Sequence, residues 1–365
     1  MSTPNQPGRV LLIHTGGTIG MRSTERGYEP SHGYLAGRLS RIHAFNDPDT
    51  DQQLTRPSRH GRRVSYDVIE LEPLIDSANM SARGWVRIAR TIAEHHADYD
   101  GFVVLHGTDT MAYTASALSF MLEGLDKTVV LTGSQIPLSR TRNDAVDNLL
   151  GAMLLAGHYV IPEVGIWFND KLLRGNRARK VDASGLDAFR SGNFTPLVQA
   201  GVEIDVRWDL VRPPEPGGLR VVPITQEDVA ALRLFPSLNA STLESFLRPP
   251  LKGLVLETYG AGNAPDDRPR LLEVLAEASA RGVVIVNCTQ CLTGMVTSDY
   301  STGRALAAAG VVAGADLTAE AALTKLQWLL SQGHPPDRVR ELMQTSLRGE
   351  LTQPRATPRF RWDGE

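Results

Sequence analysis

The sequence predicts an α/β protein, in which a larger N-terminal domain with a mainly parallel, doubly wound sheet precedes a smaller C-terminal α/β domain with its own parallel sheet. Short, continuously apolar segments alternate with helical patterns of about 10 to 15 residues, which is typical of βαβ units whose sheet is covered on both faces. One stretch interrupts this alternation, residues 213–218 with the sequence P-P-E-P-G-G. No helix or central strand tolerates that composition, so we expect a domain boundary there.

The N-terminal domain is predicted to contain five buried strands and three helices. The first strand, Arg9–His14, is short, apolar and ended by a glycine pair. One helix follows Ser81, a candidate N-cap, and carries apolar residues such as Trp85 and Ile88 at helical spacing. In chain order, the predicted strands are 9–14, 64–71, 102–105, 127–132 and 163–168, and the predicted helices are 81–96, 112–122 and 144–157.

Three other stretches of this domain show no regular pattern. Residues 21–63 contain scattered glycines, Tyr28 and a polar, basic tract that we interpret as a solvated loop. Loops of this length in compact domains are usually lids, binding loops or disordered segments. Residues 172–180 concentrate positive charge among polar residues, and residues 189–198 are predicted to be irregular.

The C-terminal domain is predicted to be a smaller unit with two strands and four helices. Thr318 is a candidate helix cap, and Pro336 is suited to the first turn of the last helix. The predicted strands are 253–258 and 283–287, and the predicted helices are 238–247, 271–280, 319–330 and 336–345. We therefore divide the chain into an N-terminal domain 1–212, a linker 213–224, a C-terminal domain 225–352 and a flexible tail 353–365.

Composition indicates a globular protein and argues against several classes. Of the 365 residues, 42% are hydrophobic and 22% are charged. A net charge of -3 gives no electrostatic reason to expect nucleic acid or an anionic membrane surface as a partner. No apolar signal segment precedes the first strand, and no run approaches the roughly 18 apolar residues of a transmembrane helix, so we expect a cytoplasmic protein. The two cysteines, Cys288 and Cys291, are too few for a disulfide framework.

The glycine-rich turns and the cysteines do not form complete cofactor motifs. The turn at 16–20, G-G-T-I-G, lacks the spacing G-x-G-x-x-G, and no Walker lysine follows it. The turn at 260–263, G-A-G-N, meets Pro265 where a third glycine should be. Cys288 and Cys291 have C-x-x-C spacing, but a structural zinc site needs a second pair of ligands. These features disfavour nucleotide binding and zinc, and they leave a redox role open.

Two predicted strands end in threonines, which indicates a site with a hydroxyl nucleophile. The first strand runs into H-T-G-G-T (14–18), and the third into H-G-T-D-T (106–110). Open α/β sheets bind their ligands at the carboxyl ends of parallel strands. A threonine hydroxyl needs a neighbouring base to act as a nucleophile, and Asp109 with Lys180 could supply that relay. The pattern favours a hydrolase or an acyl-transfer enzyme, although a single such threonine is more often a turn residue.

Several motifs together resemble those of the bacterial-type L-asparaginase family, and the similarity is greatest to its type I, cytoplasmic branch. The two threonine motifs, T-G-G-T-I-G at 15–20 and H-G-T-D-T-M at 106–111, carry the resemblance. It extends from about residue 9 to residue 352. The supporting motifs are G-Y-E-P (27–30), D-S-A-N-M (76–80), T-G-S-Q-I-P (132–137), R-G-N-R-x-x-K (174–180), Y-G-A-G-N-A-P (259–265), T-Q-C (289–291) and L-R-G-E-L (347–351).

This resemblance implies an enzyme that hydrolyses L-asparagine to L-aspartate and ammonia through a threonine-bound β-aspartyl acyl-enzyme, without a metal or an organic cofactor. It implies that Thr15 is the nucleophile and that Tyr28, on a mobile loop, orients it. Thr108, Asp109 and Lys180 would form a second catalytic triad. The substrate-binding residues implied in the same way are Asp76, Ser77, Ala78, Thr108, Asp109 and Asn263.

The resemblance also implies a homo-oligomer, either a dimer or a dimer of dimers, in which Asn263 reaches the site of a neighbouring subunit. Some type I enzymes respond cooperatively to their substrate, and Thr289, Gln290 and Cys291 resemble the segment near the regulatory site. Arg179 sits where a small hydroxyl residue is usual, so the sequence leaves regulation open.

Other functions on the same fold remain open at the level of sequence. The chain could be a glutaminase-asparaginase of broader specificity, or the asparaginase-like subunit of a tRNA-dependent amidotransferase. It could also be a catalytically silent protein that binds an amino acid for regulation. The presence of Thr15, Tyr28, Thr108, Asp109 and Lys180 argues against a silent protein.

Overall fold

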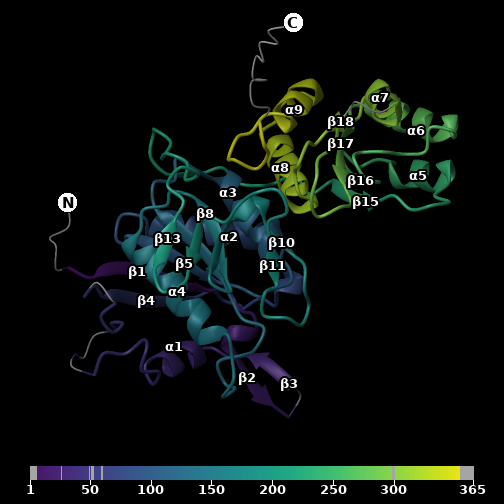
Figure 1. Cartoon of the computed structure of the whole chain (residues 1–365). Coiled ribbons are helices and arrows are strands. Elements are labelled where there is room, and N and C mark those ends of the chain that lie inside the picture. Colours follow the sequence, from purple (N-terminus) through teal and green to yellow (C-terminus); the bar gives the residue numbers. More distant parts are fainter. Residues whose placement is uncertain are drawn as a thin grey trace, which may run out of the picture.

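Two separate sheets, each accompanied by helices, organise the protein (Figure 1). The structure is a computed structural model that describes residues 6–25, 27–48, 50, 53–58, 61–297 and 301–353. The N-terminal sheet has eight strands and the C-terminal sheet has four, which confirms the predicted α/β class with a larger first unit. The boundaries at 212 and 225 stay predictions, and the predicted tail lies outside the described residues after Gln353.

Five parallel strands form one half of the N-terminal sheet, in the order β8-β7-β5-β1-β4. Every side chain of β5, β7 and β8 is buried, as their continuous apolar sequences predict for a sheet covered on both faces. All five predicted strands are confirmed. They are β1 (Gly8–His14), β4 (Val64–Glu70), β5 (Gly101–Leu105), β7 (Thr128–Thr132) and β8 (Val164–Phe168).

Helices cover both faces of this sheet, because successive side chains of a strand point to opposite faces. Leu11 and Ile13 of β1 belong to the hydrophobic cluster of α2 and α3, whereas Val10 and Leu12 belong to that of α4 and the short helix α1. The helices are α1 (Tyr34–Leu39), α2 (Ala82–Glu94), α3 (Met111–Met121) and α4 (Ala145–His158). Ser81 is the N-cap residue of α2, as predicted.

Beyond β8 the sheet continues with antiparallel strands that the sequence does not predict. β9 pairs with β8, β12 with β9, and β13 with β12. Strands of three or four residues are too short for an apolar alternation to be recognised, so stretches predicted to be irregular contain part of the sheet. The strands are β9 (Lys171–Arg174), β12 (Val198–Ala200) and β13 (Ile204–Val206), and two ribbons pair β10 (Arg179–Lys180) with β11 (Phe189–Arg190) and β6 (Leu122–Glu123) with β14 (Arg220–Val221).

Part of the region 21–63 is regular, contrary to the prediction. β2 (Met21–Thr24) and β3 (Gly27–Pro30) form an antiparallel hairpin that places Ser23 opposite Tyr28, and α1 follows it. Their sequences, M-R-S-T and G-Y-E-P, contain no run of alternating apolar residues, so the periodicity gave no signal. The described residues between α1 and β4 form loops with one isolated bridge, from Leu54 to Ser65.

The C-terminal sheet is parallel throughout, in the order β15-β16-β17-β18. The two predicted strands and four predicted helices are present, and the Thr318 side chain caps α8 by accepting from the backbone N–H of Ala321 at 3.1 Å. β15, α7 and β18 were not predicted. The elements are β15 (Val229–Arg233), α5 (Ala240–Phe246), β16 (Gly253–Thr258), α6 (Pro269–Ala280), β17 (Val284–Thr289), α7 (Ser301–Ala308), β18 (Val312–Ala313), α8 (Ala319–Ser331) and α9 (Pro336–Met343).

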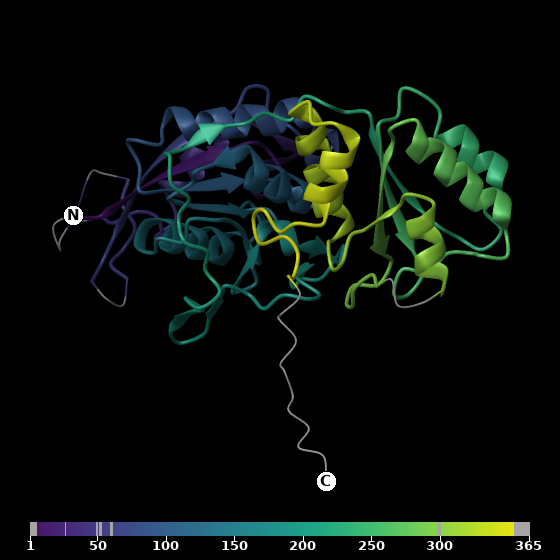
Figure 2. The same cartoon turned by 90° about the horizontal axis from the view of Figure 1, so that it is seen from above.

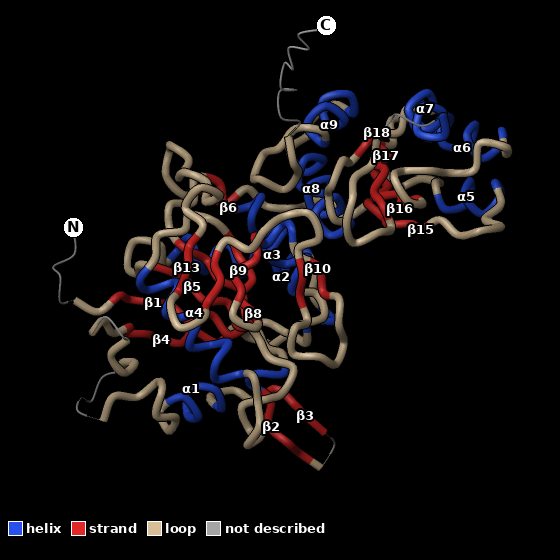
Figure 3. Tube along the Cα trace, viewed as in Figure 1, coloured by secondary structure: helices blue, strands red, loops and turns tan. Residues whose placement is uncertain are grey.

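Helix α8 joins the two sheets. It packs on α3, where Ser116 Oγ and Thr324 Oγ1 are 2.7 Å apart and the rings of Phe120 and Trp328 are in contact. The same hydrophobic cluster continues into β17 of the C-terminal sheet through Val286. Figure 2 shows the yellow C-terminal helices between the two units, and Figure 3 shows the same helices in blue beside the red strands of the two sheets. The contact between them therefore resembles the interior of one domain.

The R-G-N-R motif (174–177) holds a C-terminal loop (347–352) against the N-terminal unit through hydrogen bonds. Arg177 Nε donates to the carbonyl of Gly349 at 2.7 Å. In the same loop Glu350 pairs with Lys325 of α8 at 2.6 Å, and both side chains are completely buried. Because a buried charge that loses its partner is strongly destabilising, this pair fixes the loop in place.

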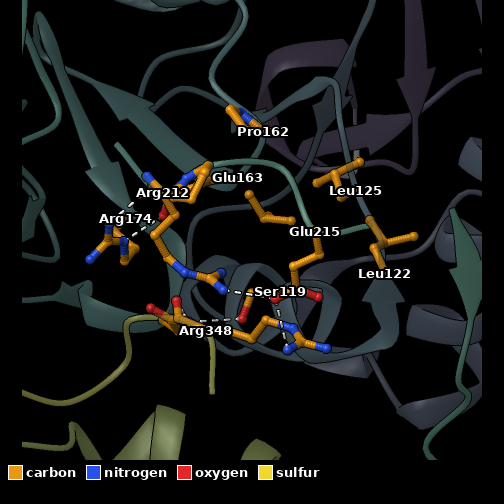
Figure 4. Close-up of a pocket in the computed structure, with 12 residues that line it drawn as sticks. Ser119, Leu122, Leu125, Pro162, Glu163, Arg174, Arg212, Glu215 and Arg348 are labelled. Atoms are coloured by element: carbon orange, nitrogen blue, oxygen red, sulfur yellow. Dashed lines mark hydrogen bonds and ion pairs between the residues drawn. The ribbon is translucent and has the colours of Figure 1, made fainter. Parts of the chain in front are cut away.

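A small charged pocket beside this loop contains further contacts between the loop and the N-terminal unit (Figure 4). Arg174 donates to both carboxylate oxygens of Glu163, at 2.5 and 3.0 Å. Arg212 and Arg348 both donate to Glu215, at 2.8 and 3.1 Å. The three arginines of the pocket are thus all paired with carboxylates, and Arg212 and Arg348 connect the predicted linker to the loop 347–352 through Glu215.

Candidate active site

The carboxyl ends of four parallel strands meet at one edge of the N-terminal sheet. His14 of β1 lies beside Glu70 of β4 and Leu105 of β5, and Leu105 lies beside Thr132 of β7. The loops that follow these strands therefore adjoin one another, as expected for the ligand-binding edge of an open α/β sheet.

Thr15 is held by the neighbouring strand. Its backbone N–H and its hydroxyl both donate to the carbonyl of Leu105, each at 3.0 Å, and the residue is 1% exposed. The carbonyl of Thr15 accepts from the N–H of Ile75 at 2.7 Å. The hydroxyl is thus fixed between the loops that follow β4 and β5.

Glycines allow these loops to approach one another closely. A Cβ on Gly17, whose φ is +85°, would lie 2.4 Å from the backbone nitrogen of Gly107. A Cβ on Gly107 would lie 2.4 Å from the hydroxyl oxygen of Ser77. Any side chain at these positions would push the three loops apart, which explains the glycines of both threonine motifs.

Lys180 joins Thr108 and Asp109 in one network of charge and hydrogen bonds. Its Nζ donates to Thr108 Oγ1 at 2.8 Å and to Asp109 Oδ1 at 2.7 Å. Thr108 Oγ1 in turn donates to Gln135 Oε1 at 3.2 Å. The side chain of Lys180 is 17% exposed and that of Asp109 is 67% exposed. A shielded ammonium group therefore faces a hydroxyl, while the carboxylate stays open to a ligand.

The loop that follows β4 presents Asp76, Ser77 and Ala78 in the short 3₁₀ turn Ser77–Asn79. Asp76 Oδ1 accepts from the N–H of Ala78 at 3.1 Å, and Thr110 Oγ1 donates to the carbonyl of Ser77 at 2.7 Å. Ser77 is buried against the Thr108 loop, whereas Asp76 and Ala78 are exposed. The predicted substrate-binding residues of both loops are thus adjacent.

The two histidines beside the threonines are neutral structural groups. Burial lowers the pKa of His106 to about 4, although the carbonyl of Gly107, 2.7 Å from Nδ1, opposes that shift. Its Nε2 lies 2.9 Å from Thr114 Oγ1. Burial also lowers the pKa of His14 to about 4, and its ring lies against Gly20. Neither ring carries a charge near neutral pH, so neither supplies a cation to the site.

Gln135 and Asp144 belong to the framework of the site, although neither is predicted from the sequence as a site residue. Asp144 accepts from the backbone N–H groups of Gln135 and Ile136 at 3.0 and 2.9 Å, which fixes the loop after β7. The neighbouring Asn143 caps α4 by accepting from the N–H of Ala145 at 3.1 Å. The sequence did contain one signal that could have identified Gln135, which is its position shortly after a buried parallel strand.

Tyr28 and Asn263 stay predictions in their roles. The backbone of Tyr28 lies in β3, and its side chain is outside the described part of the structure. Asn263 lies in the turn after β16 of the C-terminal sheet, where its N–H donates to the carbonyl of Tyr259 at 2.8 Å.

The three residues of the predicted regulatory segment lie at the end of β17. Thr289 Oγ1 donates to the carbonyl of Gly260 at 2.6 Å and accepts from the N–H of Cys291 at 3.0 Å. Gln290 Nε2 donates to the carbonyls of Leu234 and Glu257 at 2.7 and 2.9 Å. The segment thus ties β17 to β15 and β16.

Two further residues, Arg179 and Cys288, are relevant to the predicted regulatory segment. Arg179 Nε lies 3.2 Å from Glu320 of α8, so the residue directly before Lys180 is anchored by the C-terminal unit. Burial raises the pKa of Cys288 to about 12, whereas Cys291 is exposed. A buried thiol of this kind stays protonated, which disfavours a redox role for Cys288 in the C-x-x-C spacing.

Comparison with protein families agrees with this geometry over both units. The family model "Asparaginase, N-terminal" matches residues 9–212, and the model "Glutaminase/Asparaginase C-terminal domain" matches residues 228–343. The chain belongs to the asparaginase family. The resemblance of its motifs to that family is thereby confirmed.

Relatives of this asparaginase-family chain carry different names, two of which follow. It is 48% identical over 356 residues to the 60 kDa lysophospholipase of Homo sapiens, an alignment that covers 95% of the chain and 62% of that protein. The chain therefore spans less than two thirds of the length of this relative. It is 47% identical over 351 residues to L-asparaginase 1 of Escherichia coli (strain K12), covering 95% of the chain and 99% of that protein.

Solved structures of the family share the whole fold. The structure of L-asparaginase I from Vibrio cholerae matches with a TM-score of 0.85 and 42% identity, over 95% of this chain and 100% of that one. The L-asparaginase from Thermococcus kodakarensis matches with a TM-score of 0.83 and 34% identity, over 95% and 100%. None of the helices among the described residues has the length and apolar character of a membrane span.

Proposed function

We propose that the protein hydrolyses L-asparagine to L-aspartate and ammonia through a β-aspartyl ester on Thr15. The observation that carries the proposal is the contact of Lys180 with Thr108 and Asp109 at the same sheet edge as Thr15. A lysine held between a carboxylate and a hydroxyl can relay a proton for hydroxyl chemistry. The asparagine specificity is supported by the E. coli, V. cholerae and T. kodakarensis relatives, whose names state it.

Substrate binding uses the exposed groups of the two loops. The carboxylate of Asp109 attracts the α-ammonium group of asparagine, while Ser77 with its neighbours Asp76 and Ala78 holds the α-carboxylate. The side-chain amide then points toward Thr15, since this residue lies between those loops.

The reaction proceeds in two steps that use the same loops. Thr15 Oγ1 attacks the amide carbon as its proton passes to the relay, and the relay gives a proton of its own to the amide nitrogen, so that Lys180 keeps its charge. The amide C–N bond then breaks and the nitrogen leaves as ammonia. Water, activated by Thr108 and Lys180, then cleaves the ester and returns the proton to Thr15. The backbone N–H groups around Gly16 and Gly107 are suited to stabilise the oxyanion, and each such donor lowers the barrier by about 3 kcal/mol.

The remaining roles complete the proposal. Tyr28, on the β2–β3 hairpin, orients the nucleophile and excludes water when the hairpin closes. Asn263 contributes to the site of a neighbouring subunit in a homo-oligomer, a dimer or a dimer of dimers. Thr289, Gln290 and Cys291 form the candidate regulatory segment. The enzyme acts in the cytoplasm and needs no metal or organic cofactor.

The direct test is ammonia release from asparagine and from glutamine over a concentration series, with the wild-type protein and Thr15→Ala. We expect release from asparagine and at least a 10³-fold lower kcat, roughly, in Thr15→Ala. The fold should persist, because the Thr15 N–H still donates to Leu105.

Each other result selects a different function. Comparable rates with glutamine would support a glutaminase-asparaginase of broader specificity. Binding of asparagine without ammonia release from either amide would contradict the proposal and support a silent amino-acid-binding protein. Sigmoidal kinetics would support a working regulatory segment at 289–291.

A further inference from the structure

A groove of about 680 Å³ runs along helix α2, outside the candidate active site (α2 is labelled in Figure 1). Its walls are the exposed side of α2 and the segment Pro223–Glu227, which precedes β15. None of the residues given a role in asparagine hydrolysis lines it. Its volume lies in the range of pockets that hold small molecules, about 300 to 1,000 Å³.

One side of the groove is a row of arginines, Arg83, Arg87 and Arg90. Residues spaced by four and three positions share one helix face, and this row extends over about 10 Å of helix. Among the described residues, none of these guanidinium groups has a carboxylate within 4.0 Å or a hydrogen-bond partner. Like charges at this spacing repel one another, so a bound anion would relieve the repulsion.

Exposure alone does not leave an arginine of this chain without a partner. Arg207 and Arg270 are exposed as well, yet Arg207 lies 2.9 Å from Asp209 and Arg270 lies 2.7 Å from Glu277. Exposed arginines of this chain therefore do form ion pairs where carboxylates are near.

The rest of the groove is both apolar and acidic. Val86, Pro223 and Ile224 form an apolar surface, and Ile224 is 2% exposed. Glu94, the last residue of α2, and Glu227 also line the groove. Neither of these carboxylates is paired with an arginine of the row. They are free to accept hydrogen bonds from hydroxyl groups of a ligand.

We propose that this groove binds a nucleoside polyphosphate. The forks of the arginine row match phosphate oxygens, which guanidinium groups bind in a bidentate manner. The flat face of the base lies against Val86 and Pro223, and Glu94 or Glu227 accepts hydrogen bonds from the hydroxyls of the sugar. This ligand site is separate from the hydrolysis proposed above and does not depend on it.

Calorimetric titration of the full chain with ATP, without Mg²⁺, tests the site. We expect saturable binding that is at least about tenfold weaker in the double variant Arg87→Ala/Arg90→Ala, because two charge-assisted phosphate contacts are lost. Ammonia release in the absence of ATP should be unchanged in this variant. The matched control is Arg233→Ala/Arg248→Ala, which removes the same charge at two exposed arginines outside the groove whose guanidinium groups also have no partner within the described part of the chain. ATP binding to the control should equal that of the wild type.

Two further ligands separate the parts of the proposal. Inorganic triphosphate should bind more weakly than ATP, and adenosine more weakly still. Equal affinity for triphosphate and ATP would overturn the nucleoside part of the assignment. No binding of ATP at millimolar concentration, or an equal loss of affinity in both double variants, would overturn the site as a whole.

Discussion

The two threonine loops share a sequence pattern and a place in the sheet, but they hold their hydroxyls differently. The hydroxyl of Thr15 donates to a backbone carbonyl, that of Leu105, at 3.0 Å. The hydroxyl of Thr108 accepts from the ammonium of Lys180 at 2.8 Å and donates to Gln135 at 3.2 Å. The Thr15 hydroxyl is thus held by a neutral carbonyl, whereas the Thr108 hydroxyl is held by the charged Lys180. The difference teaches that Thr108 contacts the relay lysine directly, while the hydroxyl of the proposed nucleophile, Thr15, is held by the backbone.

The histidines that precede these threonines differ in the same sense. His106 is bonded on both ring nitrogens, to Gly107 at 2.7 Å and to Thr114 at 2.9 Å. The ring of His14 is buried without a hydrogen-bond partner among the described residues. The loop of Thr108 is therefore braced through its side chains, and the loop of Thr15 through its backbone and glycines.

The largest effect should come from removing the charge of the relay. Lys180→Met keeps the side-chain length but deletes the ammonium that contacts Thr108 and Asp109, so we expect kcat to fall by about 10³-fold with an unchanged melting temperature. The control Lys171→Met removes a lysine that pairs with Asp187 at 2.9 Å and should retain kcat. A near-normal kcat in Lys180→Met would show that the charged relay does not serve catalysis.

The buried histidines predict a loss of stability in acid. The folded state holds the pKa of His14 and His106 at about 4, below the unfolded value of 6.5, so the unfolded state binds more protons between these values. Stability therefore falls as the pH decreases from 6.5 to 4, by on the order of 3 kcal/mol for each histidine. Urea unfolding at a series of pH values measures this slope. The slope should be smaller in His106→Gln, and an identical slope would contradict the neutral, buried state of that ring.

A smaller effect is expected from crowding the backbone of the Thr15 loop. Gly17→Ala places a Cβ at 2.4 Å from Gly107 and forces a left-handed conformation on alanine, so we expect a loss of roughly 1–3 kcal/mol in unfolding free energy and reduced activity. The control is Gly61→Ala. Gly61 has a similar positive φ of +72°, and a Cβ there would meet nothing within 4 Å, so this variant isolates the conformational part of the stability loss. Equal losses in the two variants would mean that close packing of the loops contributes nothing.

The smallest effect should follow from Gln135→Leu. This change removes the acceptor of the Thr108 hydroxyl and leaves the contact with Lys180 in place, so we expect kcat to fall by about tenfold with little change in KM. Steady-state kinetics with asparagine measure both constants. A fall as large as that of Lys180→Met would show that the amide, rather than the ammonium, orients Thr108.

The sequence predicts those parts of the fold whose burial leaves a local pattern. A strand such as β5 is apolar at every position because both faces of its sheet are covered, and that signal needs no knowledge of its neighbours. β9, β12 and β13 have no such signal, since only their pairing partners make them strands. The β2–β3 hairpin was missed for the same reason.

The candidate site divides in the same way. Thr15, Thr108 and Asp109 follow apolar strands, so their shared edge could be inferred from position alone. The contact of Lys180 with Asp109 could not be inferred from position alone and was expected only from the residue types and the motif resemblance. It depends on the short β10–β11 ribbon and on a partner 71 residues away in sequence. Gln135 was overlooked although it follows a strand, since an amide side chain suggests no particular chemistry.

The hydrogen bonds between the R-G-N-R motif and the C-terminal loop have a consequence for biosynthesis. Arg177, three residues before Lys180, is held by the carbonyl of Gly349, and the loop around Gly349 is held by Glu350 on Lys325. A nascent chain that has not yet reached residue 350 lacks these anchors, although both threonine loops have long since left the ribosome. We therefore expect the relay lysine to reach its place only after residues 347–352 have been synthesised, so that catalytic competence appears after this loop has been made.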